Sequence, residues 1–320
     1  HYDGATALAE AVLMAFELGR RRKRKAIVAP DLHPEYRRVL RSYLRGSELL
    51  LSGDEDPEAG LGDLRARVDH DTACVLVQNP SFLGELLCTD ATDGLRGLAD
   101  EVHRAGGILV VVANPISLGL FRPPGEYGAD IVVAEGQPLG NPISFGGPYL
   151  GLFACRDRHK RRMPGRVVGA TVDTLGRRGF VLTLAAREQH IRRERATSNI
   201  CTNQSLCALA ASVYLSVMGR SGLRRVAELC YHKAHYASRQ IGQLRGFDVK
   251  SRHFFNEFVV RCPESLGEVN ARLWARNIIG GYELGAEYPH LDRCMLLCVT
   301  EMNTRDQIDR LVSTLGEGQR

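Results

Sequence analysis

Short, almost continuously apolar segments alternate with amphipathic helical segments over the first half of the chain. Apolar residues recur at helical spacing over residues 5–18 and 91–105. The apolar segments between such helices are typical of strands buried on both faces, and they lie at residues 26–29, 74–77, 108–112, 131–133 and 149–154. This alternation predicts an α/β fold with a doubly wound, mostly parallel sheet.

The pattern changes after residue 187. A charged helical run at 188–195 is followed by a polar, irregular stretch at 196–204. Two helical segments come next, and then strands and helices alternate, at residues 206–218, 222–244, 257–261, 265–276, 295–299 and 304–315. We therefore expect a large domain over residues 1–221 and a small α+β domain over residues 222–320.

Composition places the chain among ordinary folded proteins: 44% of its residues are hydrophobic and 25% are charged. The longest apolar runs, at 107–112 and 206–218, are too short or too polar to span a bilayer, so no membrane partner is expected. The nine cysteines are an odd number without a CxxC pair, which indicates reduced thiols in a cytoplasmic protein.

The positive charge is mild, because 42 lysines and arginines face 37 acidic residues. Two basic runs, at 19–25 and 156–166, lack any accompanying nucleic-acid recognition motif, so we interpret both as solvated surface and expect no nucleic-acid partner. His232 and His235 are three residues apart on a helix, but no third ligand is near them in sequence, and no metal site is expected.

Several long motifs resemble the subunit 1 type of the glycine cleavage system P-protein family. The most specific are NPISLGLFRPPGEYGADIVV at 114–133, EGQPLGNPISFGGPYLG at 135–151 and REQHIRRERATSNICTNQ at 187–204. The resemblance begins with YDGATALAEA at 2–11 and ends with VTEMNTRDQIDRL at 299–311. Members of the family carry further residues before YDGATA, so an N-terminal segment is expected to be missing here.

The resemblance implies the PLP-dependent transferase fold of type I. The family decarboxylates glycine with pyridoxal phosphate (PLP), which acts as the electron sink, and passes the aminomethyl group to the lipoyl arm of the H-protein. In two-subunit members, PLP lies on subunit 2. The implied partners are therefore subunit 2, lipoyl H-protein and, for the complex, glycine.

The residues themselves argue against covalently bound PLP in this chain. In fold type I, an acid that pairs with the pyridine nitrogen ends one central strand, and the Schiff-base lysine follows the next strand. The corresponding neighbourhoods here hold Asn114 in one case and Gln137 and Pro138 in the other. No lysine occurs from residue 26 to 159, and Lys160 stands in a hydrophilic run unlike the desolvated setting of a Schiff-base lysine. We expect degenerate PLP positions, no catalytic residue in this chain, and a cofactor held by the partner.

Two loops leave alternatives open. The glycine-rich stretch 136–147 could cradle a phosphate, but without the lysine a tight loop beside a degenerate site is favoured. Thr197, Ser198 and Asn199 either cap the following helix or reach the active-site cleft of the partner subunit.

The function predicted for the chain is that of a glycine decarboxylase subunit that completes and stabilises the active site of subunit 2. A self-sufficient PLP-dependent aminotransferase or lyase is the alternative, and it requires the missing lysine. A scaffold without a role in turnover is a third possibility. The run 156–166 could attract the acidic H-protein if it lies on the cleft side of the sheet, whereas on the far side it is solvated surface.

Overall fold

The computed structural model describes residues 1–88, 94–196, 198–200 and 204–317. Its large domain is built on a six-stranded sheet with the order β2-β1-β3-β4-β5-β6. Five strands are parallel, and only β6 runs antiparallel to its neighbour β5. The strands are β1 (Lys25–Val28), β2 (Leu50–Ser52), β3 (Thr72–Asn79), β4 (Ile108–Ala113), β5 (Ile131–Glu135) and β6 (Gly151–Cys155). The predicted α/β class is confirmed, with β2 as an unexpected edge strand.

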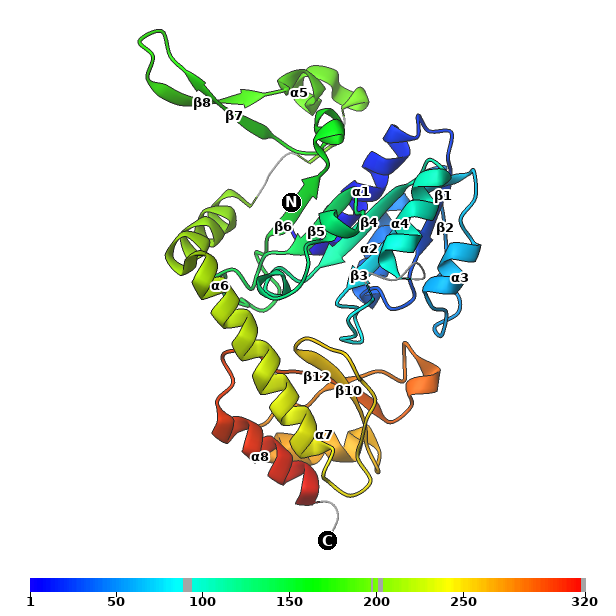
Figure 1. Cartoon of the computed structure of the whole chain (residues 1–320), viewed down its shortest axis with the longest axis vertical. Helices are drawn as coiled ribbons and strands as arrows, with labels where there is room; N and C mark the ends of the chain where they lie inside the picture. The colour runs from blue at the N-terminus through cyan, green and yellow to red at the C-terminus, as the bar shows by residue number, and fades with distance from the viewer. Residues whose placement is uncertain (89–93, 197, 201–203, 318–320) are drawn as a thin grey trace.

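Helices cover both faces of this sheet (Figure 1). One face packs against α1 (Gly4–Leu18) and α2 (Pro34–Leu44), and the other against α3 (Leu61–Ala66) and α4 (Leu95–Arg104). Helix α1 begins after Asp3, whose carboxylate accepts a hydrogen bond from the amide of Thr6 at 2.7 Å, as an N-cap residue does. Every residue of β4 is buried, as its uninterrupted apolar sequence predicts.

Two helical segments joined at a kink, together labelled α6 (Ser205–Ile241), descend from the large domain to the small one (Figure 1). Gly219, with a φ of 60° and a ψ of −172°, has non-helical geometry and separates the two segments. The two helices predicted at 206–218 and 222–244 are therefore confirmed. The predicted domain boundary after residue 221 falls inside α6 and stays a prediction.

By length and hydropathy, α6 could cross a membrane, which corrects the expectation that no apolar run is long enough. One such helix is weak evidence for a membrane span. Only 11% of its most apolar window is buried, so many of its apolar side chains are open to solvent in this chain.

The small domain has an antiparallel sheet with the order β11-β12-β10-β9. Its strands are β9 (Asp248–Val249), β10 (Glu257–Arg261), β11 (Tyr282–Glu283) and β12 (Cys294–Cys298). One face packs on α6, α7 (Leu266–Ala275) and α8 (Arg305–Gly316) around Phe258 and Met295. Both α7 and α8 begin with a capping box, which explains their sharp starts after Ser265 and Thr304.

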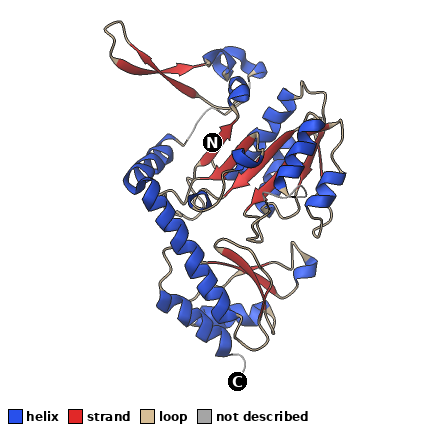
Figure 2. Cartoon of the chain, in the orientation of Figure 1, coloured by secondary structure: helices blue, strands red, loops and turns tan. Residues whose placement is uncertain are grey.

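A two-stranded hairpin of β7 (Val167–Val172) and β8 (Arg178–Thr183) projects from the large domain (Figure 2). The sequence did not predict it. The helix expected at 188–195 is reduced to α5 (Gln189–Arg192) with short 3-10 turns on either side. The 3-10 helices among the described residues are η1 (Ser117–Gly119), η2 (Pro124–Tyr127), η3 (Asp157–Arg162), η4 (Ala185–Arg187), η5 (Arg193–Arg195) and η6 (Pro289–Leu291).

Candidate functional site

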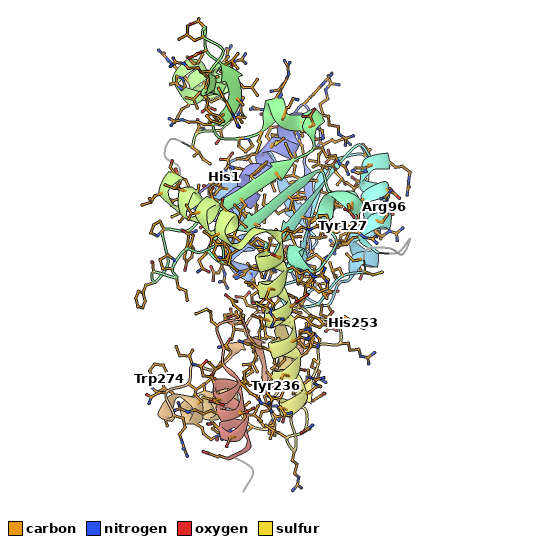
Figure 3. All side chains as sticks on the ribbon, turned by 60° about the vertical axis from the view of Figure 1, so that its left-hand side comes forward. His1, Arg96, Tyr127, Tyr236, His253 and Trp274 are labelled. Atoms are coloured by element: carbon orange, nitrogen blue, oxygen red, sulfur yellow. The ribbon has the colours of Figure 1, made fainter. Side chains whose placement is uncertain are left out.

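The carboxyl ends of the parallel strands meet the small-domain sheet across a cleft. Ligands of doubly wound sheets bind at this edge. The two domains touch beside the cleft, because the amide of Leu86 donates to the carbonyl oxygen of His253 at 2.8 Å and the Tyr288 hydroxyl donates to the Pro30 carbonyl at 3.0 Å. His253 lies at this junction, below the sheet and beside α6 (Figure 3).

Two cavities occupy the cleft. The first, of about 560 Å³, lies between the ends of β4 and β5 and the small domain, and we call it the strand-end cavity. The second, of about 700 Å³, extends from His33 and Phe82 to α8. Glu257 and Cys298 line both cavities, since they are directly opposed on β10 and β12.

The three residues assigned to the degenerate PLP positions come together in the strand-end cavity. Asn114, Gln137 and Pro138 all line it. The side-chain oxygen of Asn114 accepts from the amide of Ile116 at 3.0 Å, and the Gln137 amide group donates to the Asn141 carbonyl at 2.7 Å. Both side chains therefore shape their own loops, and their role toward any ligand stays a prediction.

Glu135 holds the loop that carries Gln137 and Pro138. Its carboxylate accepts from the amides of Gln137 at 2.9 Å, Leu150 at 3.2 Å and Gly4 at 2.9 Å. Burial raises the pKa of this carboxyl, and the three amides partly offset that effect. Glu135 thus links three segments: the end of β5, the chain just before β6 and the start of α1.

None of the five lysines lines either cavity. Lys160 is exposed and pairs with Asp157 at 2.8 Å, as the sequence suggested. Lys233 lies beside the loop that carries Glu301, and its ammonium donates to the carbonyls of Glu301 and Asn303, both at 2.5 Å. It anchors the loop after β12 and is not directed at the strand ends.

The strand-end cavity does not suit PLP. Its lining within the described part of the chain includes Glu257 and Glu301 but no lysine, arginine or histidine. A phosphate would face two acidic groups without a cation, and the aldehyde would find no amine. The described lining of this cavity therefore supplies neither the amine nor the cation that PLP requires.

Sequence reasoning missed the small-domain side of the cleft. Glu257 is partly buried, and burial raises its pKa to about 7. Burial also raises the pKa of the Cys298 thiol, and the nearby carboxylate of Glu257 adds to the effect. The available signal was the acidic residue that opens the strand EFVVR, just before its three apolar residues, but its meaning depends on which domain faces it.

The glycine-rich loop 136–147 approaches α6 closely. A Cβ at Gly140, whose φ is +83°, would lie 2.9 Å from the Cβ of Tyr214, so only glycine fits there. The Phe145 side chain at the far end of the loop is fully exposed. These features fit the tight-loop interpretation, whereas the phosphate cradle has no supporting cation among the described lining residues.

Of the three residues proposed to reach the partner's cleft, Thr197 lies outside the described residues. The Ser198 hydroxyl accepts from the amide of Ile200 at 3.1 Å and hydrogen-bonds the carboxyl of Glu10. Asn199 is exposed. The N-cap of α6 is Gln204, without a side-chain capping bond, so the capping alternative is wrong for Ser198 and Asn199. Their place near a partner stays a prediction.

The basic run 156–166 lies away from the cleft. It follows β6, which runs antiparallel to β5 and so ends at the amino edge of the parallel strands. There Arg158 pairs with the buried carboxylate of Asp130 at 2.7 Å, and His103 contacts the same carboxylate at 2.7 Å. The run is on the far side of the sheet, where we expected only solvated surface and no path for the lipoyl arm.

Comparisons with known proteins identify the family. The sequence profile described as "Glycine cleavage system P-protein" matches residues 1–315. A relative from Thermomicrobium roseum, named "Probable glycine dehydrogenase (decarboxylating) subunit 1", is 53% identical over 320 residues, which cover 99% of this chain and 70% of the relative. A relative of the same name from Desulfitobacterium hafniense is 50% identical over 323 residues, with the same coverage.

Solved structures agree on the fold. A crystal structure of glycine decarboxylase (P-protein) of the glycine cleavage system, in inhibitor-bound form, aligns with a TM-score of 0.86 and 40% identity, over 99% of this chain and 70% of that one. A NifS-like protein aligns with a TM-score of 0.70 at 13% identity, over 99% of this chain and 80% of its own. This second likeness supports the PLP-dependent fold alone.

Proposed function

Because this chain belongs to the glycine cleavage system P-protein family, we propose that it is a glycine decarboxylase subunit without its own Schiff-base lysine, active only with subunit 2. The observation that carries this proposal is the acidic, lysine-free cavity at the strand ends, where a fold type I enzyme would hold PLP. The same observation weighs against a self-sufficient aminotransferase or lyase.

The chain's own contribution is to complete and stabilise the active site of the partner. In the complex, subunit 2 binds PLP, glycine is the substrate, and the aminomethyl group passes to the lipoyl arm of the H-protein. Ser198 and Asn199 are the candidates for reaching the partner's cleft. The cytoplasm is the proposed location, which suits the eight described cysteines, all free.

An exposed apolar stripe on α6 supports the need for a partner. Leu206, Leu209, Val213 and Val217 recur at helical spacing and are 79%, 60%, 55% and 79% exposed. They form the α6 stripe. A contiguous apolar face of this kind is costly in water, and it is typical of a surface that another protein covers. We assign the α6 stripe to the contact with subunit 2.

Exchange of labelled bicarbonate into the carboxyl group of glycine tests the proposal. This chain alone should give no exchange above background. The mixture with subunit 2, PLP and lipoyl H-protein should exchange, and omission of this chain should abolish it. Exchange by this chain alone, or by subunit 2 without it, would refute the proposed division of labour.

A further inference from the structure

The strand-end cavity has the chemistry of a binding site for a ligand other than the family's cofactor. Its walls combine apolar side chains, among them Ile116, Phe255 and Met302, with the carboxyl groups of Glu257 and Glu301. At about 560 Å³ it is large enough for a small organic molecule.

The two carboxyl groups approach the cavity from different parts of the small domain. Glu257 opens β10, and Glu301 follows β12. Cys298 lies within the electrostatic influence of both carboxylates and of Cys230, and all four residues line the strand-end cavity. This places two acidic groups on a common wall opposite the strand ends.

The carboxylate of Glu257 has no hydrogen-bond or ion-pair partner among the described residues. Glu301, by contrast, accepts a hydrogen bond from the Cys230 thiol at 3.3 Å. A partly buried carboxylate without a partner is unfavourable, and burial raises the pKa of Glu257 to about 7 for this reason. A cationic ligand would supply the missing partner.

Other ligand classes fit less well. An anion would meet two acidic groups and no basic side chain among the described residues that line the cavity. A neutral apolar molecule would leave Glu257 unpaired. An alkyl chain suits the apolar wall, and an ammonium group suits the carboxylates.

We propose that the strand-end cavity binds a small aliphatic amine, whose ammonium group pairs with Glu257 and Glu301 and whose alkyl chain packs against Ile116, Phe255 and Met302. The site goes beyond the decarboxylase function and is independent of catalysis by the complex. Such a site would let this subunit bind a positively charged small molecule at the strand ends.

Binding of a matched ligand set to the full-length subunit tests the proposal. Butylamine, butanol and butyrate share their alkyl chain and differ in charge, so ligand-detected saturation-transfer NMR at about pH 8 isolates the contribution of the charge. We expect butylamine to bind, butanol to bind more weakly, and butyrate to give no site-specific signal. Equal signals from butylamine and butyrate would overturn the proposal.

Variants locate the site. Glu257→Gln should weaken butylamine binding by about tenfold or more. Glu257→Asp, which keeps the charge, should retain most of the binding. The control Glu126→Gln removes an exposed carboxylate of η2, outside the cavity, and should leave binding unchanged. The same dissociation constant for the Glu257→Gln and Glu126→Gln proteins, each with an intact thermal transition, would show that the amine binds elsewhere and refute the site.

Discussion

The carboxyl group of Glu257 becomes partly buried when the chain folds, and this gives the folded protein a specific pH dependence. Its pKa rises from an ordinary value of 4.5 to about 7 through burial. Between these values the folded chain binds more protons than the unfolded chain, so stability falls as pH rises through this window. Burial raises the pKa of Asp31 to about 6, which adds a slope of the same sign.

We therefore expect Glu257→Gln to stabilise the chain at high pH and to have little effect at low pH. Denaturant unfolding at about pH 5 and about pH 8 measures this difference. Glu126→Gln, which changes an exposed side chain, serves as the control and should leave the unfolding curves at both pH values unchanged. If Glu257→Gln raised the free energy of unfolding by the same amount at both pH values, the burial assigned to Glu257 would be contradicted.

Asp130 is the buried anchor at the opposite edge of the sheet. Its carboxylate accepts from the amide of Leu109 at 3.0 Å and pairs with Arg158 and His103. Asp130→Ala leaves that amide unsatisfied and should lower the free energy of unfolding by about 1–3 kcal/mol. Asp130→Asn should cost less, because the amide oxygen can still accept from Leu109.

The matched control for Asp130 is Asp157→Ala. Asp157 is exposed and pairs with exposed Lys160, so its loss should cost about 0–1 kcal/mol. Equal destabilisation by Asp130→Ala and Asp157→Ala in the same denaturant series would refute the anchoring role.

Replacing Ser198 and Asn199 tests the prediction that they reach the active-site cleft of the partner subunit. Since neither caps α6, their replacement by alanine removes little from this chain beyond the bonds of Ser198 to Ile200 and Glu10. The double variant should lower the turnover of the assembled complex more than its melting temperature. Ser42→Ala, which removes an exposed hydroxyl on α2, is the control. A loss of stability without a loss of turnover would assign these residues a purely structural role.

At the scale of elements, the α6 stripe makes a prediction about assembly. Leu209→Ser with Val213→Ser changes two exposed apolar side chains and should leave the folded chain intact. Affinity for subunit 2, measured by sedimentation, should fall by about tenfold or more if the stripe is buried at the centre of the contact. Leu50→Ser on β2, a residue that is 67% exposed, is the control. Unchanged affinity in the double variant would show that subunit 2 binds to a different surface of this chain.

Elements whose residues are buried by their own domain could be predicted from sequence. Strand β4 and residues 73–77 of β3 are recognisable because every side chain in them is apolar and buried. The edge strand β2 was missed because it has three residues and Leu50 faces solvent. The β7–β8 hairpin was missed because its apolar side chains, such as Phe180 at 65% exposure, do not pack into a hydrophobic core of this chain.

The residues of the candidate site also differ in whether the sequence could locate them. Asn114, Gln137 and Pro138 could be located because they follow recognisable parallel strands, whose carboxyl ends share one edge. Glu257 and Cys298 could not, because they reach the cleft only through the packing of the small domain against that edge. Periodicity predicts which face of a strand is buried but not which distant element covers it.

At the scale of the whole molecule, two features of this chain indicate that it works with a partner: the composition of the strand-end cavity and the exposure of the α6 stripe. The strand-end cavity has no lysine among its described lining residues, and the α6 stripe is apolar but exposed. A subunit that completes a partner accounts for both features. We therefore propose that the covalent bond to PLP belongs to subunit 2.

Borohydride reduction of the reconstituted complex, followed by peptide mapping, tests this claim most directly. Reduction converts the bond between PLP and its lysine into a stable pyridoxyl-lysine. We expect this residue in subunit 2 only, both in the complex and after separate reduction of each full-length subunit with PLP. A pyridoxyl group at Lys23, Lys25, Lys160, Lys233 or Lys250 would contradict it.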